Sequence, residues 1–124
     1  MRDYSPIDAV AEILNEVPEL VFVFALDDRY LYINQAAALF LAADPFEVIG
    51  NHWSDLGYPA EVMEPLLLHV RQAAQTGEPE RYRLTTSPGR GSRVLDVSLT
   101  PLRSDSDTVY AVLMLAHDIT EFVG

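Results

Sequence analysis

The sequence contains no cysteine, and this absence narrows the chemistry that the chain can perform. Without cysteine, the chain has no thiol nucleophile, no thiolate zinc site and no residue that forms a flavin–cysteinyl adduct. The absence of cysteine also fits a reducing compartment. The first ten residues are charged and lack the apolar region of a signal peptide, so we expect a cytoplasmic protein.

Basic residues are few: eight arginines stand against 19 acidic residues, for a net charge of −11. Such a chain repels phosphate backbones and anionic membrane surfaces, which argues against nucleic-acid partners. Long apolar runs are absent as well. The two longest, residues 20–26 and 109–116, are far shorter than the roughly 20 residues needed to span a bilayer. We therefore expect no membrane insertion.

The chain does have enough apolar sequence for one core, since 49% of its 124 residues are hydrophobic. We divide it into an N-terminal amphipathic helix, residues 1–18, and a single domain, residues 19–122. Ser5 and Pro6 form a helix start, and Pro18 ends the segment. The apolar stripe of this helix is a candidate dimer surface and consists of Ile7, Val10, Leu14 and Val17.

Five segments have the patterns of β-strands. The segment 20–26 is β-branched and aromatic, and 109–116 is apolar throughout, so both predict strands buried on two faces. The segment 30–33 follows a tight polar turn and pairs with the first as a hairpin. The segments 81–86 and 94–102 alternate between polar and apolar residues, which predicts strands with one buried face.

Helical patterns lie between the second and third strands. Asn34 is a good N-cap for a short helix over 35–43. Asp44 and the proline after it open another helical turn, which Gly50 ends. Residues 60–76 follow helical spacing up to a closing glycine, and Pro65 within them predicts a kink or a fresh start.

These elements predict an α+β fold with one antiparallel sheet and short helices on one face. Hairpin-length turns connect the first strand to the second, the third to the fourth and the fourth to the fifth. Because the first and last strands are apolar on both sides, we expect them to be central neighbours, which gives the sheet order 2-1-5-4-3. The other face then needs a cover, either the N-terminal helix or a partner subunit.

Several short motifs in this order resemble the PAS domain family. The stretch 25–41 matches the family pattern at Asp27, Asn34 and Ala36, although Tyr30 stands where many members have glycine. Gly50 matches the turn after the third helix. The stretch 76–84 resembles the start of the third strand, and HDITEF, residues 117–122, resembles the ending through which many such domains join a signalling helix. The resemblance covers residues 7 to 122.

The resemblance implies a sensory or interaction module of a larger protein, such as a histidine kinase of a two-component system, a cyclic-di-GMP enzyme or a transcription regulator. A downstream effector domain and a homodimer are the implied partners. Asp118 and Thr120 are the expected exit through which a change in the domain is relayed. Asp118 is expected to pair with Arg81, Arg83 or Arg103, or else to be a solvated strand end.

The resemblance also implies a pocket for a small ligand, with a fully packed core as the alternative. The candidate lining residues are Phe22, Phe24, Asn34, Leu39, Phe40, Trp53, Leu66, Leu67, His69, Val70, Tyr82, Leu84, Val97, Leu99 and Leu113. Most are apolar, so Asn34, Tyr82 and His69 are the candidates for orienting a ligand.

Cofactor and enzyme alternatives are weaker. Flavin photochemistry is excluded because Trp53 stands where the light-sensing subclass has its cysteine. Haem would need an axial ligand, for which His69 is the candidate, but a lone histidine facing a core is more often a packed residue. We expect no catalysis, since the chain has no nucleophile elbow and the strand carboxylate of Asp96 points away from the core. The remaining alternative is a ligand-free dimerisation module.

Overall fold

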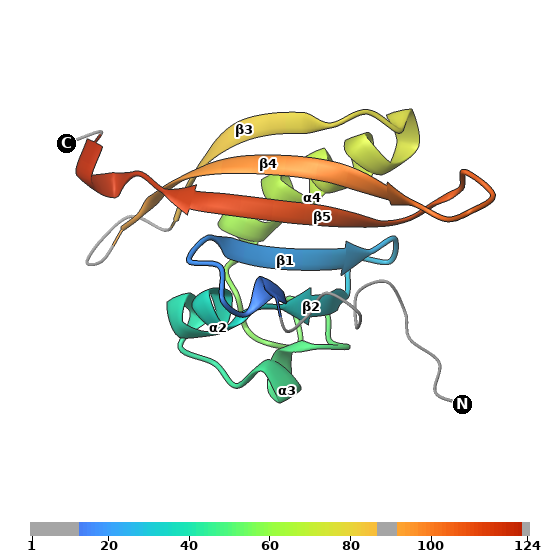
Figure 1. Ribbon diagram of the computed structural model, residues 1–124. Helices are drawn as coiled ribbons and strands as arrows, with labels where there is room; N and C mark the ends of the chain where they lie inside the picture. The colour runs from blue at the N-terminus through green and yellow to red at the C-terminus, as the bar shows by residue number, and fades with distance from the viewer. Residues whose placement is uncertain (1–12, 87–91, 123–124) are drawn as a thin grey trace.

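The computed structural model describes residues 13–86 and 92–122 of the chain. These residues form a five-stranded antiparallel sheet with the order β2-β1-β5-β4-β3 (Figure 1). The strands are β1 (Leu20–Ala25), β2 (Tyr30–Ile33), β3 (Glu80–Thr85), β4 (Val94–Arg103) and β5 (Val109–Asp118). The predicted fold class and sheet order are confirmed.

The first and last strands of the sheet lie side by side, as their apolar sequences predict. Phe22 of β1 pairs with Met114 of β5, and the next residue along, Val23, pairs with Leu113. Since side chains alternate along a strand, the two pairs face opposite sides of the sheet. Phe22 and Met114 belong to the main core, whereas Val23 and Leu113 belong to a smaller cluster on the other face. On that second face β5 is only half-buried, because Leu113 and Leu115 keep part of their surface exposed.

The helical elements that lie wholly within the described residues are α2 (Gln35–Leu41), α3 (Pro45–Val48), α4 (Ala60–Thr76) and the short 3-10 turn η1 (Thr120–Phe122). Asn34 caps α2 by accepting the backbone N–H of Ala37 at 2.9 Å, and Asp44 caps α3 in the same way. Both caps are as predicted. Helix α2 ends two residues earlier than expected, because Ala42 takes a left-handed backbone conformation with φ 54°.

The long helix α4 supplies most of the cover over one face of the sheet. It ends at Gly77, whose φ of 72° and N–H bond to the Ala73 carbonyl make the predicted left-handed C-cap. The sequence predicted a kink or a fresh start at Pro65, and the fresh start does not occur, because α4 continues through this residue to Thr76. Pro65 lies on the exposed side of α4, where its ring meets solvent and not the core.

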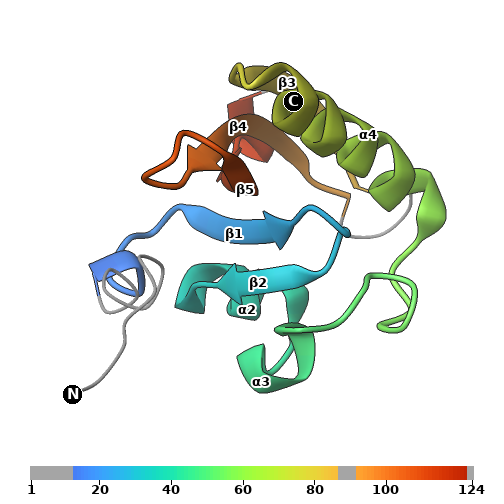
Figure 2. The same ribbon diagram turned by 90° about the vertical axis from the view of Figure 1, so that its right-hand side faces the viewer.

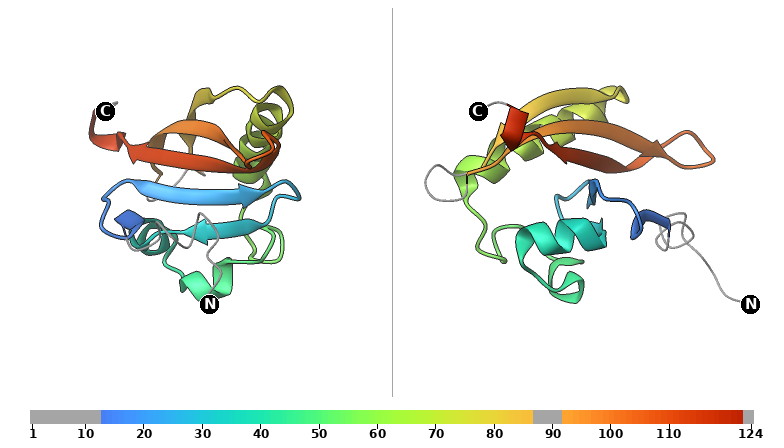
Figure 3. Two further views of the ribbon diagram at one scale, coloured as in Figure 1. Left: turned by 45° about the vertical axis from the view of Figure 1, so that its right-hand side comes forward. Right: turned by 60° about the vertical axis from the view of Figure 1, so that its left-hand side comes forward.

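The two faces of the sheet differ in what covers them. Helices α4 and α2 lie on one side of β1, and the turn around residues 13–16 lies on the other (Figures 2 and 3). There Leu14 packs against the smaller cluster, as expected for a cover of the second face. The remaining predicted N-terminal helix, including Ile7 and Val10, lies outside the described residues. None of the described helices has the length and apolar character to cross a membrane.

Candidate functional site

A cavity of about 300 Å³ lies between the sheet and the helices that cover it. All five strands or the residues next to them contribute to its wall, together with α2, α4 and the loop before α4. The lining residues are Phe22, Phe24, Tyr30, Phe40, Leu41, Tyr58, Pro59, Val62, Met63, Leu66, Leu84, Thr86, Leu95 and Met114. The fold therefore holds a vacancy of a size that suits a small molecule.

The described side chains that line this cavity are apolar apart from three hydroxyl groups, those of Tyr30, Tyr58 and Thr86. The Thr86 hydroxyl is already engaged, since it accepts the backbone N–H of Arg93 at 2.7 Å. Burial raises the pKa of Tyr30 far above its ordinary value, and the phenol of Tyr58 raises it further. Burial also raises the pKa of Tyr58. Both phenols are therefore protonated donors at neutral pH.

Five of the residues expected to line a pocket do line this cavity: Phe22, Phe24, Phe40, Leu66 and Leu84. The buried residues Leu67, Val70, Val97 and Leu99 pack within the main core and do not reach it. Trp53 packs against the same core from the loop before α4. Leu39 is 71% exposed on the outer side of α2, and Leu113 faces the opposite side of the sheet.

The three polar residues expected to orient a ligand lie outside the cavity wall. Asn34 is fully buried, but its amide is used in bonds to five backbone groups. His69 stacks on Tyr82, with 4.3 Å between ring centroids, and its Nδ1 lies 3.0 Å from a carboxylate oxygen of Glu80. Neither His69 nor Tyr82 lines the cavity. The described lining residues thus offer no axial nitrogen to a haem iron.

Sequence reasoning missed nine of the lining residues: Tyr30, Leu41, Tyr58, Pro59, Val62, Met63, Thr86, Leu95 and Met114. For Tyr30 a signal existed, because it is the position at which the sequence departs from the glycine common in the PAS pattern. Tyr58 lies in the loop 51–59, whose path no periodicity predicts. Met63 lies one residue after Val62 on α4, so its place in the wall depends on how that helix is rotated over the sheet.

The expected exit at the end of β5 is built around the carboxylate of Asp118. It accepts the backbone N–H of Thr120 at 3.0 Å and also the Thr120 hydroxyl, and its other oxygen lies 3.1 Å from the Arg93 guanidinium. The Thr120 hydroxyl, with help from the Thr120 N–H and Arg93, holds the pKa of Asp118 below its ordinary value. The Thr120 oxygen in turn accepts the N–H of Val94 at 2.9 Å.

The partner of Asp118 corrects the prediction, which named Arg81, Arg83 or Arg103. Arg83 lies 3.5 Å from Asp96, and Arg103, the last residue of β4, lies 3.6 Å from Asp107 on the β4–β5 turn. Arg93 pairs with Asp118 because it directly precedes β4, whose first residues run beside the end of β5. These contacts tie the end of β5 to the start of β4, and we call Asp118, Thr120, Arg93 and Val94 the exit clamp.

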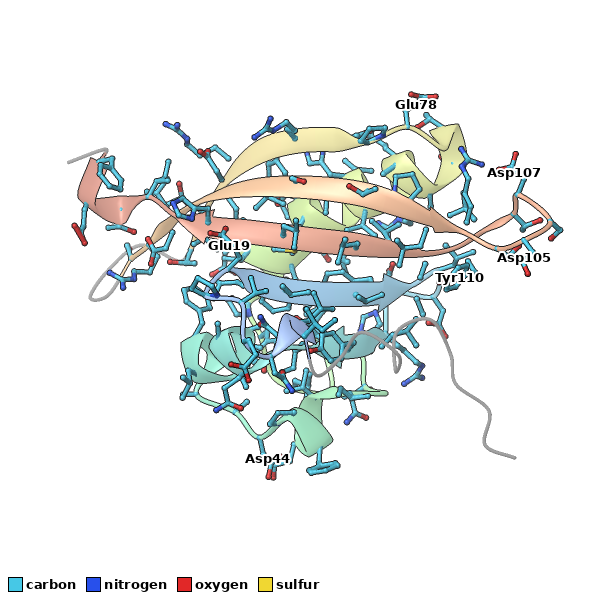
Figure 4. The ribbon with its side chains drawn as sticks, in the orientation of Figure 1. Glu19, Asp44, Glu78, Asp105, Asp107 and Tyr110 are labelled. Atoms are coloured by element: carbon cyan, nitrogen blue, oxygen red, sulfur yellow. The ribbon has the colours of Figure 1, made fainter. Side chains whose placement is uncertain are left out.

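The second face of the sheet carries ion pairs and half-buried apolar side chains. The Nδ1 atom of His117 on β5 lies 2.9 Å from a carboxylate oxygen of Glu19 (Figure 4), the residue just before β1. Since side chains alternate along a strand, His117 and Asp118 lie on opposite faces of the sheet. Asp96 is exposed on this face, as its parity predicts. None of the described residues forms a cluster of three or more potential metal ligands.

Comparisons with known proteins agree on the fold. The sequence profile of the family described as "PAS fold" matches residues 14–124. The PAS domain of BvgS from Bordetella pertussis is similar with a TM-score of 0.79 and 18% identity, over 94% of this chain and 88% of that one. A domain of an HTR-like protein from Haloarcula marismortui is similar with a TM-score of 0.70 and 20% identity. The match covers 84% of this chain and 100% of that one.

A third similar structure is the complex of phage VqmA with DPO, with a TM-score of 0.78 and 21% identity. The match covers 95% of this chain but only 55% of the phage VqmA chain, so the similarity concerns part of that protein. A search of curated protein sequences gave no match. At these identities the structural likeness concerns the fold.

Proposed function

Since this chain belongs to the PAS fold family, we propose that it is a sensory domain of a signal-transduction protein and that the cavity is its ligand site. The observation that carries the proposal is the apolar cavity of about 300 Å³ walled by the central strands themselves. A well-packed domain interior has few vacancies of this size, and ligand pockets in proteins begin at about 300 Å³. We propose no catalytic role, because no charged side chain is among the described lining residues.

The path from the cavity to the chain exit supports a relay through the sheet. Met114 lines the cavity from β5, four residues before Asp118 on the same strand. Leu95 lines it from β4, directly after Val94 of the exit clamp. A ligand that shifts these two strands relative to each other would act on the clamp, and we propose that a downstream effector domain reads this change. A histidine kinase, a cyclic-di-GMP enzyme and a transcription regulator are the proposed kinds of effector.

The ligand site can be tested with α-methylstyrene, an uncharged aromatic hydrocarbon, as the probe. We expect the probe to raise the melting temperature of the wild-type protein, because a molecule that binds only the native state stabilises it. Val62→Phe adds a ring to a half-buried cavity wall and should abolish this rise. Native mass spectrometry of the purified protein, which reveals a retained compound, completes the measurement.

Leu68→Phe is the matched control, because it adds a ring to the exposed side of the same helix. We expect this variant to respond to the probe as the wild-type protein does. The cavity is not the ligand site if Val62→Phe responds equally well. A wild-type protein that neither retains a compound nor responds to the probe would overturn the sensory proposal itself.

Dimerisation is the second candidate function, and the second face of the sheet favours it. Leu102, Leu113 and Leu115 are half-buried there and form an apolar strip beside the covered part of β1. We propose that a second copy covers this strip as an isologous dimer. Light scattering should then give a molar mass of twice that of one chain. For Leu113→Glu it should give the mass of a single chain.

A further inference from the structure

We propose that Tyr30 selects the ligand: its phenol donates a hydrogen bond to an acceptor on a neutral, planar aromatic molecule held in the cavity. The proposal deepens the ligand site proposed above and rests on it. It assigns the ligand a chemical class, an aromatic ketone or a heteroaromatic ring with an acceptor nitrogen. Three features of the cavity wall support the proposal: its aromatic rings, a hydroxyl donor that lacks a strong acceptor, and the absence of charged side chains among the described lining residues.

Aromatic rings gather at the β1–β2 end of the cavity. The Tyr30 ring lies 4.8 Å from that of Phe24 and 6.2 Å from that of Phe22, between centroids. The Tyr58 ring meets Tyr30 edge-on, at 6.3 Å and 89°. Aromatic pairs prefer such offset and edge-to-face arrangements at these separations. A planar aromatic ligand can therefore pack against these rings in the same arrangements.

The hydroxyl of Tyr30 is a buried donor without a strong acceptor. The residue is 2% exposed, and among the residues that the structure describes its hydroxyl contacts the Met63 sulfur at 4.0 Å. A thioether sulfur is a weak acceptor, whereas buried phenols usually have a full hydrogen bond. Both Tyr30 and Met63 line the cavity, so a guest can supply the missing acceptor there.

The charge of the surroundings excludes anions. No cationic side chain is among the described lining residues, and the chain as a whole carries −11. A carboxylate would lose its hydration in this wall without a counter-charge, which is costly. Because burial raises the pKa of Tyr30, the phenol remains a donor over the physiological range. The preferred guest is therefore neutral.

Three probes of nearly the same shape separate these features: acetophenone has a carbonyl acceptor, α-methylstyrene has none, and benzoate is charged. Dissociation constants are measured by calorimetry or ligand-observed NMR for the wild-type protein, Tyr30→Phe and Tyr82→Phe. We expect Tyr30→Phe to weaken acetophenone about 2- to 10-fold, the worth of one neutral hydrogen bond, and to leave α-methylstyrene unchanged. Benzoate should bind at least about 10-fold more weakly than acetophenone.

Tyr82→Phe is the control, because the buried hydroxyl of Tyr82 has no hydrogen-bond partner among the described residues, while Tyr82 lies outside the cavity wall. It should change the affinity of neither neutral probe. The role of Tyr30 is overturned if Tyr30→Phe binds acetophenone as tightly as the wild-type protein does. If Val62→Phe still blocks binding in that case, the cavity remains the ligand site. Benzoate as tight as acetophenone overturns the preference for neutral guests. If neither neutral probe binds the wild-type protein, the ligand site and this inference fail together.

Discussion

Asn34 joins three parts of the chain through one buried side chain. Its Oδ1 accepts the backbone N–H groups of Val21 and Ala37, at 3.1 and 2.9 Å. Its Nδ2 lies within hydrogen-bond distance of the carbonyls of Leu14, Val17 and Glu19. One amide thus caps α2, holds the start of β1 and fixes the segment that leads into it, so its role here is structural.

We expect Asn34→Ala to lower the free energy of unfolding by about 2–4 kcal/mol. The change removes a helix cap, worth about 1 kcal/mol, and leaves buried backbone groups without partners, each costing about 1–3 kcal/mol. Urea denaturation measures the loss. Asn51→Ala is the control, because among the described residues the side chain of Asn51 makes one bond, to the Glu47 carbonyl, at a partly exposed position. Similar losses in both variants would contradict the role given to Asn34.

At the scale of elements, α4 shows tertiary packing prevailing over a local breaker. A proline inside a helix removes one hydrogen bond and crowds the carbonyl four residues before it. Helix α4 nevertheless runs without interruption across Pro65, because Met63, Leu66, Leu67 and Val70 bury their side chains around it. The burial of one apolar helix face outweighs the local cost of the ring.

Pro65→Ala should therefore stabilise the protein, by about 1–3 kcal/mol in the free energy of unfolding. The substitution restores the bond to the Glu61 carbonyl and touches no core side chain, since Pro65 is exposed. Thermal and urea unfolding measure the gain. Gln72→Ala, at another exposed position of α4, should stay within about 0.5 kcal/mol of the wild-type protein. A loss of stability in Pro65→Ala would show that the proline is needed where it stands.

At the scale of the whole molecule, the cavity and the chain exit share β4 and β5. The exit clamp joins the start of β4 to the end of β5 through the carboxylate of Asp118. The pKa of this carboxylate is lower in the folded protein than its ordinary value of 3.8. A lowered pKa means that the folded state favours the ionised form. The stability it contributes is therefore present above the unfolded-state pKa and is lost as the pH falls through the folded-state value.

We expect Asp118→Ala to lower the free energy of unfolding at pH 7 by about 1–2 kcal/mol, and the difference from the wild-type protein to shrink below pH 4. Urea denaturation at pH 7 and pH 3 measures both effects. The exposed Asp105 on the β4–β5 turn provides the control, Asp105→Ala, which should show neither (Figure 4).

The same variant tests the proposed relay by hydrogen exchange. In the wild-type protein, α-methylstyrene should change the exchange rate of the Val94 and Ile119 amides, which bond across the clamp to Thr120 and Val94. In Asp118→Ala this response should be reduced. Identical responses in the two proteins would show that the clamp takes no part in transmission.

Local chemistry and patterning were enough to predict much of this molecule. The caps at Asn34 and Asp44, the left-handed Gly77 and the strand parities of Leu95, Val97 and Asp96 depend on residues close in sequence. The central pairing of β1 and β5 also followed from sequence, because a strand that is apolar on both sides must be covered on both sides.

The tertiary structure alone decided which apolar side chains surround a vacancy and which fill the core. Leu66 lines the cavity and its neighbour Leu67 does not, although both are buried leucines of one helix. Tyr30 and Tyr58 come together from a strand and a loop 28 residues apart, and Arg93 reaches Asp118 only because β4 and β5 run side by side. A cavity is the volume left between packed elements, so the rotation and spacing of those elements determine its size and lining. Neither the rotation nor the spacing can be predicted from the residue types along the chain.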